Sequence, residues 1–191
     1  QHALVIGAET LSKMMDWTDR STCVLFGDGA GAAVLSASKE DGILSMVQGS
    51  DGFRGDVLNC MARKVNNPYK KSDTALSYVS MNGQEVYRFA VKTVPKAVTD
   101  AVEQAGLQLE EVDLFLLHQA NYRIIEAVSK RLGQPMEKFP TNLEECGNIS
   151  AASVPILLDN VNNHGMMRKG MKIVLAGFGA GLTWGATVIN W

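Results

Sequence analysis

The apolar run at residues 112–117, which only Asp113 interrupts, constrains the fold most, because such a run is typical of a strand buried on both faces of a sheet. Residues 82–106 carry apolar side chains at steps of three and four, which predicts the longest helix of the chain, with a kink or break at Pro95. The same period at Tyr122–Leu132 predicts another helix. A buried strand between two helices indicates an α/β layer architecture.

Strand-like runs near both ends of the chain extend this pattern. We expect strands at residues 2–8, 22–26, 30–37, 42–47, 172–176 and 183–190, and a helix at about 150–163 with Pro155 in its first turn. Residues 49–75 hold glycine, asparagine, proline and lysine without a sustained period, which predicts a long surface connection.

Charge and hydropathy argue against two classes of partner. The 191 residues carry 18 basic and 20 acidic side chains, and the net charge of −2 gives no long-range field to attract nucleic acid or an anionic membrane. The longest apolar stretches, such as residues 3–8, are far shorter than the roughly 20 residues of a membrane span. We therefore expect a soluble protein that binds neither nucleic acid nor membrane.

Three widely spaced cysteines, Cys23, Cys60 and Cys146, favour a reducing compartment such as the cytoplasm over a disulfide framework. They form no C-x-x-C pair, so no metal site is expected. Gln1 is followed directly by a strand-like run, with no charged leader or signal core before it. A chain that opens on a buried strand is expected to have lost its beginning.

Two polar residues stand where α/β proteins form sites. His118 follows the buried strand, and ligands bind outside the carboxyl ends of such strands. Asn148 lies in a small polar segment, residues 146–153, just ahead of a helix. Taken alone, a histidine at a strand end is more often structural, and an asparagine before a helix is more often a cap or turn residue. Both interpretations stay open at this point.

Two glycine-rich turns, at residues 27–31 and 177–181, raise the alternative of a Rossmann-type dinucleotide binder. Neither turn has the G-x-G-x-x-G spacing between a strand and a helix, since each leads into another strand. Glycine here also lets the backbone pass close to a neighbouring segment or a thioester. The dinucleotide interpretation therefore rests on glycine content alone.

Five segments occur in the order and spacing of β-ketoacyl-acyl-carrier-protein synthase III, a family of condensing enzymes that the chain resembles. They are FGDGAGAA at residues 26–33, MNGQEV at 81–86, HQAN at 118–121, GNISAASVP at 147–155 and GFGAGLTWG at 177–185. The resemblance implies a thiolase-like layered α/β fold of two similar halves, and a cytoplasmic homodimer. It assigns residues 1–76 to the last strands of the first half and a connection, and residues 77–191 to a nearly complete second half.

The resemblance also implies a two-step reaction that starts fatty acid synthesis. An active-site cysteine takes an acyl group from acyl-CoA; malonyl-acyl-carrier protein then loses carbon dioxide, and the resulting carbanion attacks the thioester. His118 and Asn148 match the family's catalytic pair, whose N–H groups donate to the enolate. Ala180 matches a backbone donor of a second oxyanion hole, where many members carry glycine. The acyl-CoA and the malonyl-carrier protein are substrates, and no cofactor or metal is implied.

The family's nucleophilic cysteine precedes the strand that opens this chain, so the resemblance puts it upstream of Gln1. Cys23, Cys60 and Cys146 are poor substitutes, and each is expected to be a buried or incidental thiol. The implied partner is an N-terminal half that bears the cysteine. The isolated chain is then expected to be inactive.

Several further residues match substrate-binding positions of the family. Gly83, Tyr87 and Asn121 match the pantetheine tunnel. Arg88, Arg123, Lys130 and Arg131 match the docking patch for acyl carrier protein. Positions 123, 130 and 131 share one side of a helix, and without the resemblance they would be an ordinary solvated face.

Two alternatives remain beside the fatty acid enzyme. Asn148 also fits a chalcone-synthase-like polyketide condensing enzyme of the same fold. From a different class, the chain fits a non-catalytic half-domain that keeps the surface for carrier protein.

Overall fold

The computed structural model describes residues 1–60, 69 and 77–191. A four-stranded sheet lies at its centre, with the order β3 (Ile43–Ser50), β8 (Thr183–Asn190), β7 (Lys172–Gly179) and β6 (Leu114–Leu117). β6 and β7 are parallel, and the other two pairs are antiparallel. A separate antiparallel ribbon consists of β1 (His2–Thr10) and β2 (Asp28–Ser36). The short strands β4 (Leu58–Asn59) and β5 (Ser80–Met81) also pair.

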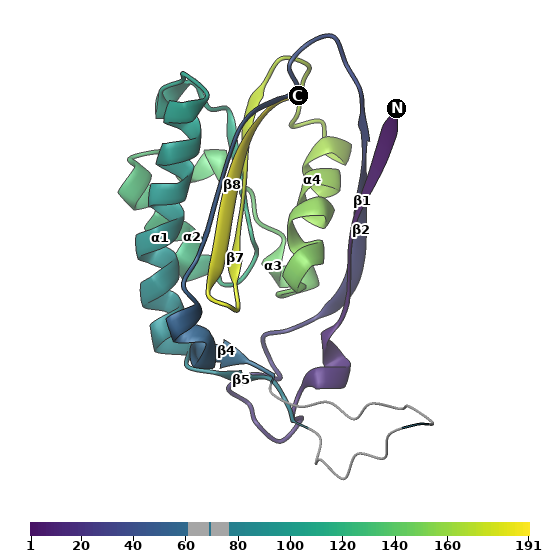
Figure 1. The fold of residues 1–191 in the computed structure, drawn as a ribbon, viewed down its shortest axis with the longest axis vertical. Coiled ribbons are helices and arrows are strands. Elements are labelled where there is room, and N and C mark those ends of the chain that lie inside the picture. The colour runs from purple at the N-terminus through teal and green to yellow at the C-terminus, as the bar shows by residue number, and fades with distance from the viewer. Residues whose placement is uncertain (61–68, 70–76) are drawn as a thin grey trace.

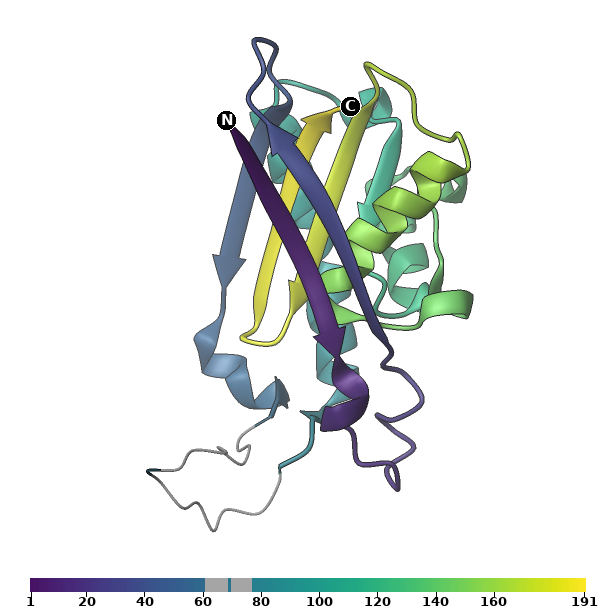
Figure 2. The same ribbon diagram turned by 90° about the vertical axis from the view of Figure 1, so that its right-hand side faces the viewer.

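Helices cover both faces of the central sheet (Figure 1). α1 (Gly83–Gln104) packs on β8, β3 and β7, with α2 (Tyr122–Leu132) beside it. On the other face, α4 (Ser153–Asn163) lies between the sheet and the β1-β2 ribbon. Figure 2 shows the ribbon crossing in front of α4 and the sheet. In the described part of the chain, the connecting segments hold α3 (Leu143–Cys146) and five 3-10 turns: η1 (Leu11–Met14), η2 (Gly52–Val57), η3 (Leu109–Glu111), η4 (Met136–Lys138) and η5 (Ser150–Ala152).

β6 is buried along its whole length, as its sequence predicts. Phe115 and Leu117 enter the large core under α1 and α2, whereas Leu114 and Leu116 enter a smaller cluster under α4. The strand thus joins the two layers. Its last residue carries the chain directly to His118, which fixes where that side chain lies.

The helices begin and end at the expected residues, but α1 is not broken at Pro95. Asn82 caps α1 by accepting a hydrogen bond from the Glu85 N–H at 3.2 Å, and Gly133 ends α2 with a left-handed φ of 65°. α1 continues through Pro95 and is 22 residues long in all. Pro95 is itself buried with the apolar face of the helix, and this packing outweighs the proline's cost.

The strand expected at residues 22–26 is not formed. These residues make turns, and Phe26 makes a single bridge to Asn148. Asp19 explains the turns, since its carboxylate accepts from the Ser21 N–H and its carbonyl accepts from the Cys23 N–H.

The strand expected at 42–47 is found as β3, but in a different place from the one the sequence suggested. β3 pairs with β8 in the central sheet, and Leu44 and Val47 pack against the core under α1. The expected boundary between the two halves, at residue 76, would therefore separate β3 from the sheet to which it belongs. Within the expected connection, η2 and β4 are regular, whereas residues 61–68 and 70–76 lie outside the described residues.

The remaining expected elements are confirmed. β1, β2, β7 and β8 cover the other predicted strands, and α4 follows η5 with Pro155 in its first turn. Among the described residues, no helix is both long enough and apolar enough to cross a membrane.

Candidate active site

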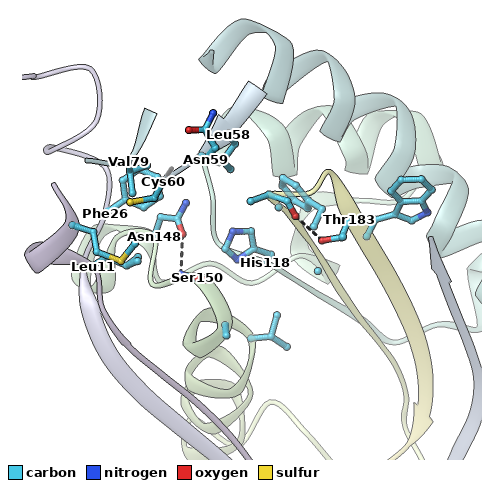
Figure 3. A pocket seen from close by; sticks show the side chains of 18 of the residues that line it. Leu11, Phe26, Leu58, Asn59, Cys60, Val79, His118, Asn148, Ser150 and Thr183 are labelled. Atoms are coloured by element: carbon cyan, nitrogen blue, oxygen red, sulfur yellow. Dashed lines mark hydrogen bonds between the residues drawn. The ribbon is translucent and has the colours of Figure 1, made fainter. Parts of the chain in front are cut away.

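A cavity of about 680 Å³ opens at the carboxyl ends of the parallel strands β6 and β7. Its wall also includes η1, the end of β4, the segment at residues 148–154 and the turn between β7 and β8. This is the edge at which α/β sheets bind ligands. Figure 3 shows the side chains that converge there, with His118 between Asn148 and Thr183.

His118 is held at the end of β6 and is nearly buried. Its N–H donates to the Ala176 carbonyl at 2.7 Å, and its ring meets the Phe178 ring edge-on with centroids 5.2 Å apart. Burial lowers the pKa of His118 from 6.5 to about 4, so the ring is neutral near pH 7. Within the described residues, no hydrogen-bond partner occupies either ring nitrogen, and a neutral ring offers one N–H donor to the cavity.

Asn148 is fixed through both its backbone and its side chain. Its N–H donates to the Leu25 carbonyl at 3.0 Å, and its carbonyl accepts from the Gly27 N–H at 2.9 Å. Its Oδ1 accepts from the Ser150 N–H at 3.0 Å (Figure 3). Because the amide oxygen is engaged, the NH₂ group remains to donate elsewhere.

His118 and Asn148 thus line one cavity although 29 residues separate them in the chain. Both are neutral hydrogen-bond donors. Such a pair can stabilise a developing oxyanion, whereas an amide cannot transfer a proton.

Ala180 also lines the cavity, in the turn between β7 and β8. Its carbonyl accepts from the Thr183 hydroxyl at 2.9 Å. Among the described non-glycine residues only Ser150 has a positive φ, so Ala180 occupies a conformation that any residue adopts. The alanine therefore fits this turn without backbone strain.

The predicted pantetheine positions are not part of the cavity wall. Gly83 is the first residue of α1, and Tyr87 is partly exposed on the same helix. The side chain of Asn121 caps α2 by accepting from the Arg123 N–H at 2.8 Å. A structural role thus explains Asn121 at least as well as ligand binding.

The four predicted docking residues lie on the surface of two neighbouring helices. Arg88 on α1 pairs with Glu85, which also binds Arg54 at 3.0 Å. On α2, the Lys130 ammonium donates to the Glu126 carboxylate at 2.8 Å, and this hydrogen bond raises the pKa of Lys130. Arg123 and Arg131 are exposed, with the buried residues of α2 on the opposite side.

Several residues of the cavity wall are not among the predicted site residues. Cys60 lies in the wall (Figure 3), where its thiol donates to the Ser77 carbonyl at 3.3 Å. No local motif in the sequence marks it as a wall residue. Leu11 and Met14 of η1, and Val79 just before β5, add apolar side chains, and no sequence signal unites them.

Cys23 and Cys146 are partly buried free thiols outside the cavity wall. Within the described parts of the chain, no cluster of histidine, cysteine and carboxylate side chains is arranged to hold a metal ion.

Two sequence families match the chain. The family described as 3-oxoacyl-[acyl-carrier-protein (ACP)] synthase III matches residues 1–52, and the family described as its C-terminal part matches residues 102–191. The two matches have the order that the five motifs predicted.

Bacterial proteins of known name are similar over the whole chain. β-Ketoacyl-[acyl-carrier-protein] synthase III from Clostridium acetobutylicum is 49% identical over 190 residues, which cover 99% of this chain and 58% of that protein. The protein of the same name from Clostridium kluyveri is 51% identical over 187 residues, 98% of this chain and 58% of its own length. The chain thus spans less than two thirds of the relatives that it matches.

Solved structures agree with the sequence relatives. The synthase III from Thermus thermophilus superposes with a TM-score of 0.90 at 44% identity, over 100% of this chain and 59% of that one. The priming β-ketosynthase of the R1128 polyketide pathway also gives 0.90, at 36% identity, over 99% of this chain and 57% of that one. The α/β architecture described above is therefore a thiolase-like fold, as predicted.

Proposed function

Because the chain belongs to the 3-oxoacyl-acyl-carrier-protein synthase III family, we propose that it supplies the decarboxylating part of a condensing site that starts fatty acid synthesis. The substrates are an acyl-CoA primer and a malonyl group on acyl carrier protein. One observation carries the proposal: the neutral ring of His118 and the NH₂ group of Asn148 line the same cavity, and neither has a competing acceptor among the described residues.

The two donors suit one step of the reaction. As the carboxylate of the malonyl thioester leaves as carbon dioxide, its bonding electrons move to the α-carbon and the thioester oxygen. Hydrogen bonds from His118 and Asn148 stabilise that enolate oxygen. The α-carbon then attacks the acyl thioester on the cysteine, and collapse of the tetrahedral intermediate releases the thiolate. The backbone N–H of Ala180 is proposed as a donor to this second oxyanion.

Release of carbon dioxide from malonyl-carrier protein tests these roles in the protein expressed from its complete gene. We expect His118→Ala and Asn148→Ala to lower this rate by about 100- to 1,000-fold, the effect of removing an oxyanion donor. Acyl transfer from acyl-CoA should be largely kept. His164→Ala and Asn162→Ala, on the surface at the end of α4, are matched controls. Equal loss of both half-reactions would refute the assignment.

The nucleophilic cysteine is proposed to come from a separate portion of the protein, an N-terminal half. The β1-β2 ribbon supports this, since Leu4, Val5 and Ile6 expose apolar surface that a further layer would cover. We place the division between the halves at residues 37–42, because β2 belongs to the ribbon and β3 to the central sheet. A homodimer and a cytoplasmic location complete the proposal, and light scattering of the complete protein tests the first.

Acyl carrier protein is the proposed partner of the basic surface. Arg123 and Arg131 are exposed on α2, with Arg88 on the adjacent α1 and Lys130 beside them. Arg123→Glu should raise the KM for malonyl-carrier protein and leave acyl transfer unchanged. An unaltered KM would remove Arg123 from the docking surface. Gly83, Tyr87 and Asn121 remain proposals for the pantetheine path, and no cofactor is proposed.

A polyketide priming role is the second candidate. It is supported by the likeness to the R1128 priming ketosynthase, which is weaker in sequence than the likeness to the fatty acid enzymes. Assay with carrier proteins from the two pathways separates these functions. A protein that binds carrier protein but never decarboxylates the malonyl group would instead be a non-catalytic half-domain.

A further inference from the structure

Gln119 follows His118 directly and is buried with no exposed surface. Its Nε2 donates to the Leu117 carbonyl at 2.8 Å, which folds the side chain back over the end of β6. Its Oε1 accepts from the Asn142 N–H at 3.3 Å. A buried amide that lost these partners would cost about 1–3 kcal/mol per unpaired group, so its position is well defined.

The hydrogen bond from the Asn142 N–H to Gln119 connects the end of β6 to the segment that runs from Asn142 to Asn148. The Asn142 carbonyl accepts from the Cys146 N–H at 3.0 Å, which closes the single turn of α3, and Gly147 and Asn148 follow at once. α3 has four residues and makes too few internal hydrogen bonds to hold itself in place. Its location depends on its anchors, one of which is Gln119.

The other anchor of Asn148 belongs to a different part of the molecule. Leu25 and Gly27 bind the Asn148 backbone from the segment that leads into β2. His118 is bound instead to β7 through Ala176. The Gln119 side chain therefore joins the segment that carries the His118 ring to the segment that carries the Asn148 side chain.

We infer that Gln119 is a positioning residue, whose side chain sets the spacing between the N–H donors of His118 and Asn148 by tying the end of β6 to Asn142. The inference rests on the proposed function, in which both donors meet one enolate oxygen. A displacement of one donor by about 1 Å can lower a rate by roughly 100-fold.

Gln119→Met tests the inference, because methionine fills a similar volume without either hydrogen bond. Gln134→Met is the matched control: Gln134 is also buried and hydrogen-bonded, but its partners Glu110 and Lys138 lie away from the cavity. In the protein expressed from its complete gene, we expect Gln119→Met to lower kcat for malonyl decarboxylation by about 10- to 100-fold with little change in KM. Acyl transfer should be largely kept, and Gln134→Met should leave kcat unchanged.

A second variant separates positioning from packing. Gln119→Glu keeps the acceptor for the Asn142 N–H, and when its carboxyl is protonated it also keeps a donor to the Leu117 carbonyl. Burial favours the protonated form. Decarboxylation relative to the wild type at each pH should therefore be restored at low pH and fall as the pH rises. A purely volumetric role would give a flat ratio.

Hydrogen exchange gives a readout that needs no activity. Amides at residues 142–148 should exchange faster in Gln119→Met than in the wild type, and at the wild-type rate in Gln134→Met. Unchanged exchange there overturns the inference even in an inactive protein. If His118→Ala abolishes decarboxylation while Gln119→Met retains the full kcat, the inference fails and the proposed function stands.

Discussion

The two faces of the central sheet are covered differently, and the contrast shows which part of the molecule is complete in itself. Under α1, Val94 and Val98 are buried in a core that encloses the sheet. On the other side, the β1-β2 ribbon packs on the outer face of α4, and its Leu4, Ile6 and Val34 are 61%, 60% and 67% exposed. The first layer is closed and the second is open. The cavity lies at their junction, so its chemistry depends on both.

The largest loss of stability is expected when a side chain of the core under α1 is truncated. Phe115 is fully buried and stacks on Phe139 with centroids 4.7 Å apart. Phe115→Ala should lower the free energy of unfolding by about 3–5 kcal/mol through lost contacts and the resulting cavity. Denaturant unfolding of the protein from its complete gene measures this. A loss below about 1 kcal/mol would contradict a tightly packed first layer.

A pH titration probes the junction itself. Burial lowers the pKa of His118 to about 4, so the unfolded chain binds more protons than the folded one between that value and 6.5. The free energy of unfolding should therefore fall as the pH drops from about 6.5 toward 4, by up to about 3 kcal/mol. His118→Gln should remove this part of the pH dependence, whereas His164→Gln at the exposed end of α4 should keep it. Identical slopes for all three proteins would argue that His118 is hydrated.

The open layer gives a smaller, more informative effect. If a further portion of the protein covers the ribbon, Leu4→Ala should cost about 2 kcal/mol, as for a buried leucine. If the ribbon stays exposed, the same change should cost less than about 0.5 kcal/mol. We expect the first outcome, measured by denaturant unfolding of the complete protein.

The smallest effect concerns the start of α1. Asn82→Ala removes the side-chain cap of that helix and should cost about 1 kcal/mol. Asn82→Asp retains the acceptor and serves as the control. A cost well above this value would mean that the cap also orders the neighbouring strand β5.

Local patterns predicted the elements that local forces determine. The unbroken burial of β6, the cap at Asn82 and the stop at Gly133 all follow from residue type and spacing. The positions of His118 and Asn148 came from motifs, and the structure brings both to one cavity.

The errors have two causes: a local hydrogen-bond pattern that overrides strand propensity, and strand partners that lie far away in the chain. Val24 and Leu25 have an apolar, strand-like sequence, but the hydrogen bonds of Asp19 hold this stretch in turns. The sequence of β3 does not indicate which sheet the strand joins, because its partner β8 lies far away in the chain. Cys60 directly follows β4 and lies in the cavity wall beside the pairing of β4 with β5, which joins residues more than 20 positions apart.

The order of the central sheet also bears on how the chain is made. β8 lies between β3 and β7, yet the ribosome completes it after every other strand of that sheet. Until then β3 has no strand partner among the described residues, and its contact with β8 joins residues as distant as Ser45 and Thr187. Such long-range pairing slows folding and leaves apolar strands uncovered meanwhile. The nascent protein should therefore depend on chaperones until β8 has emerged.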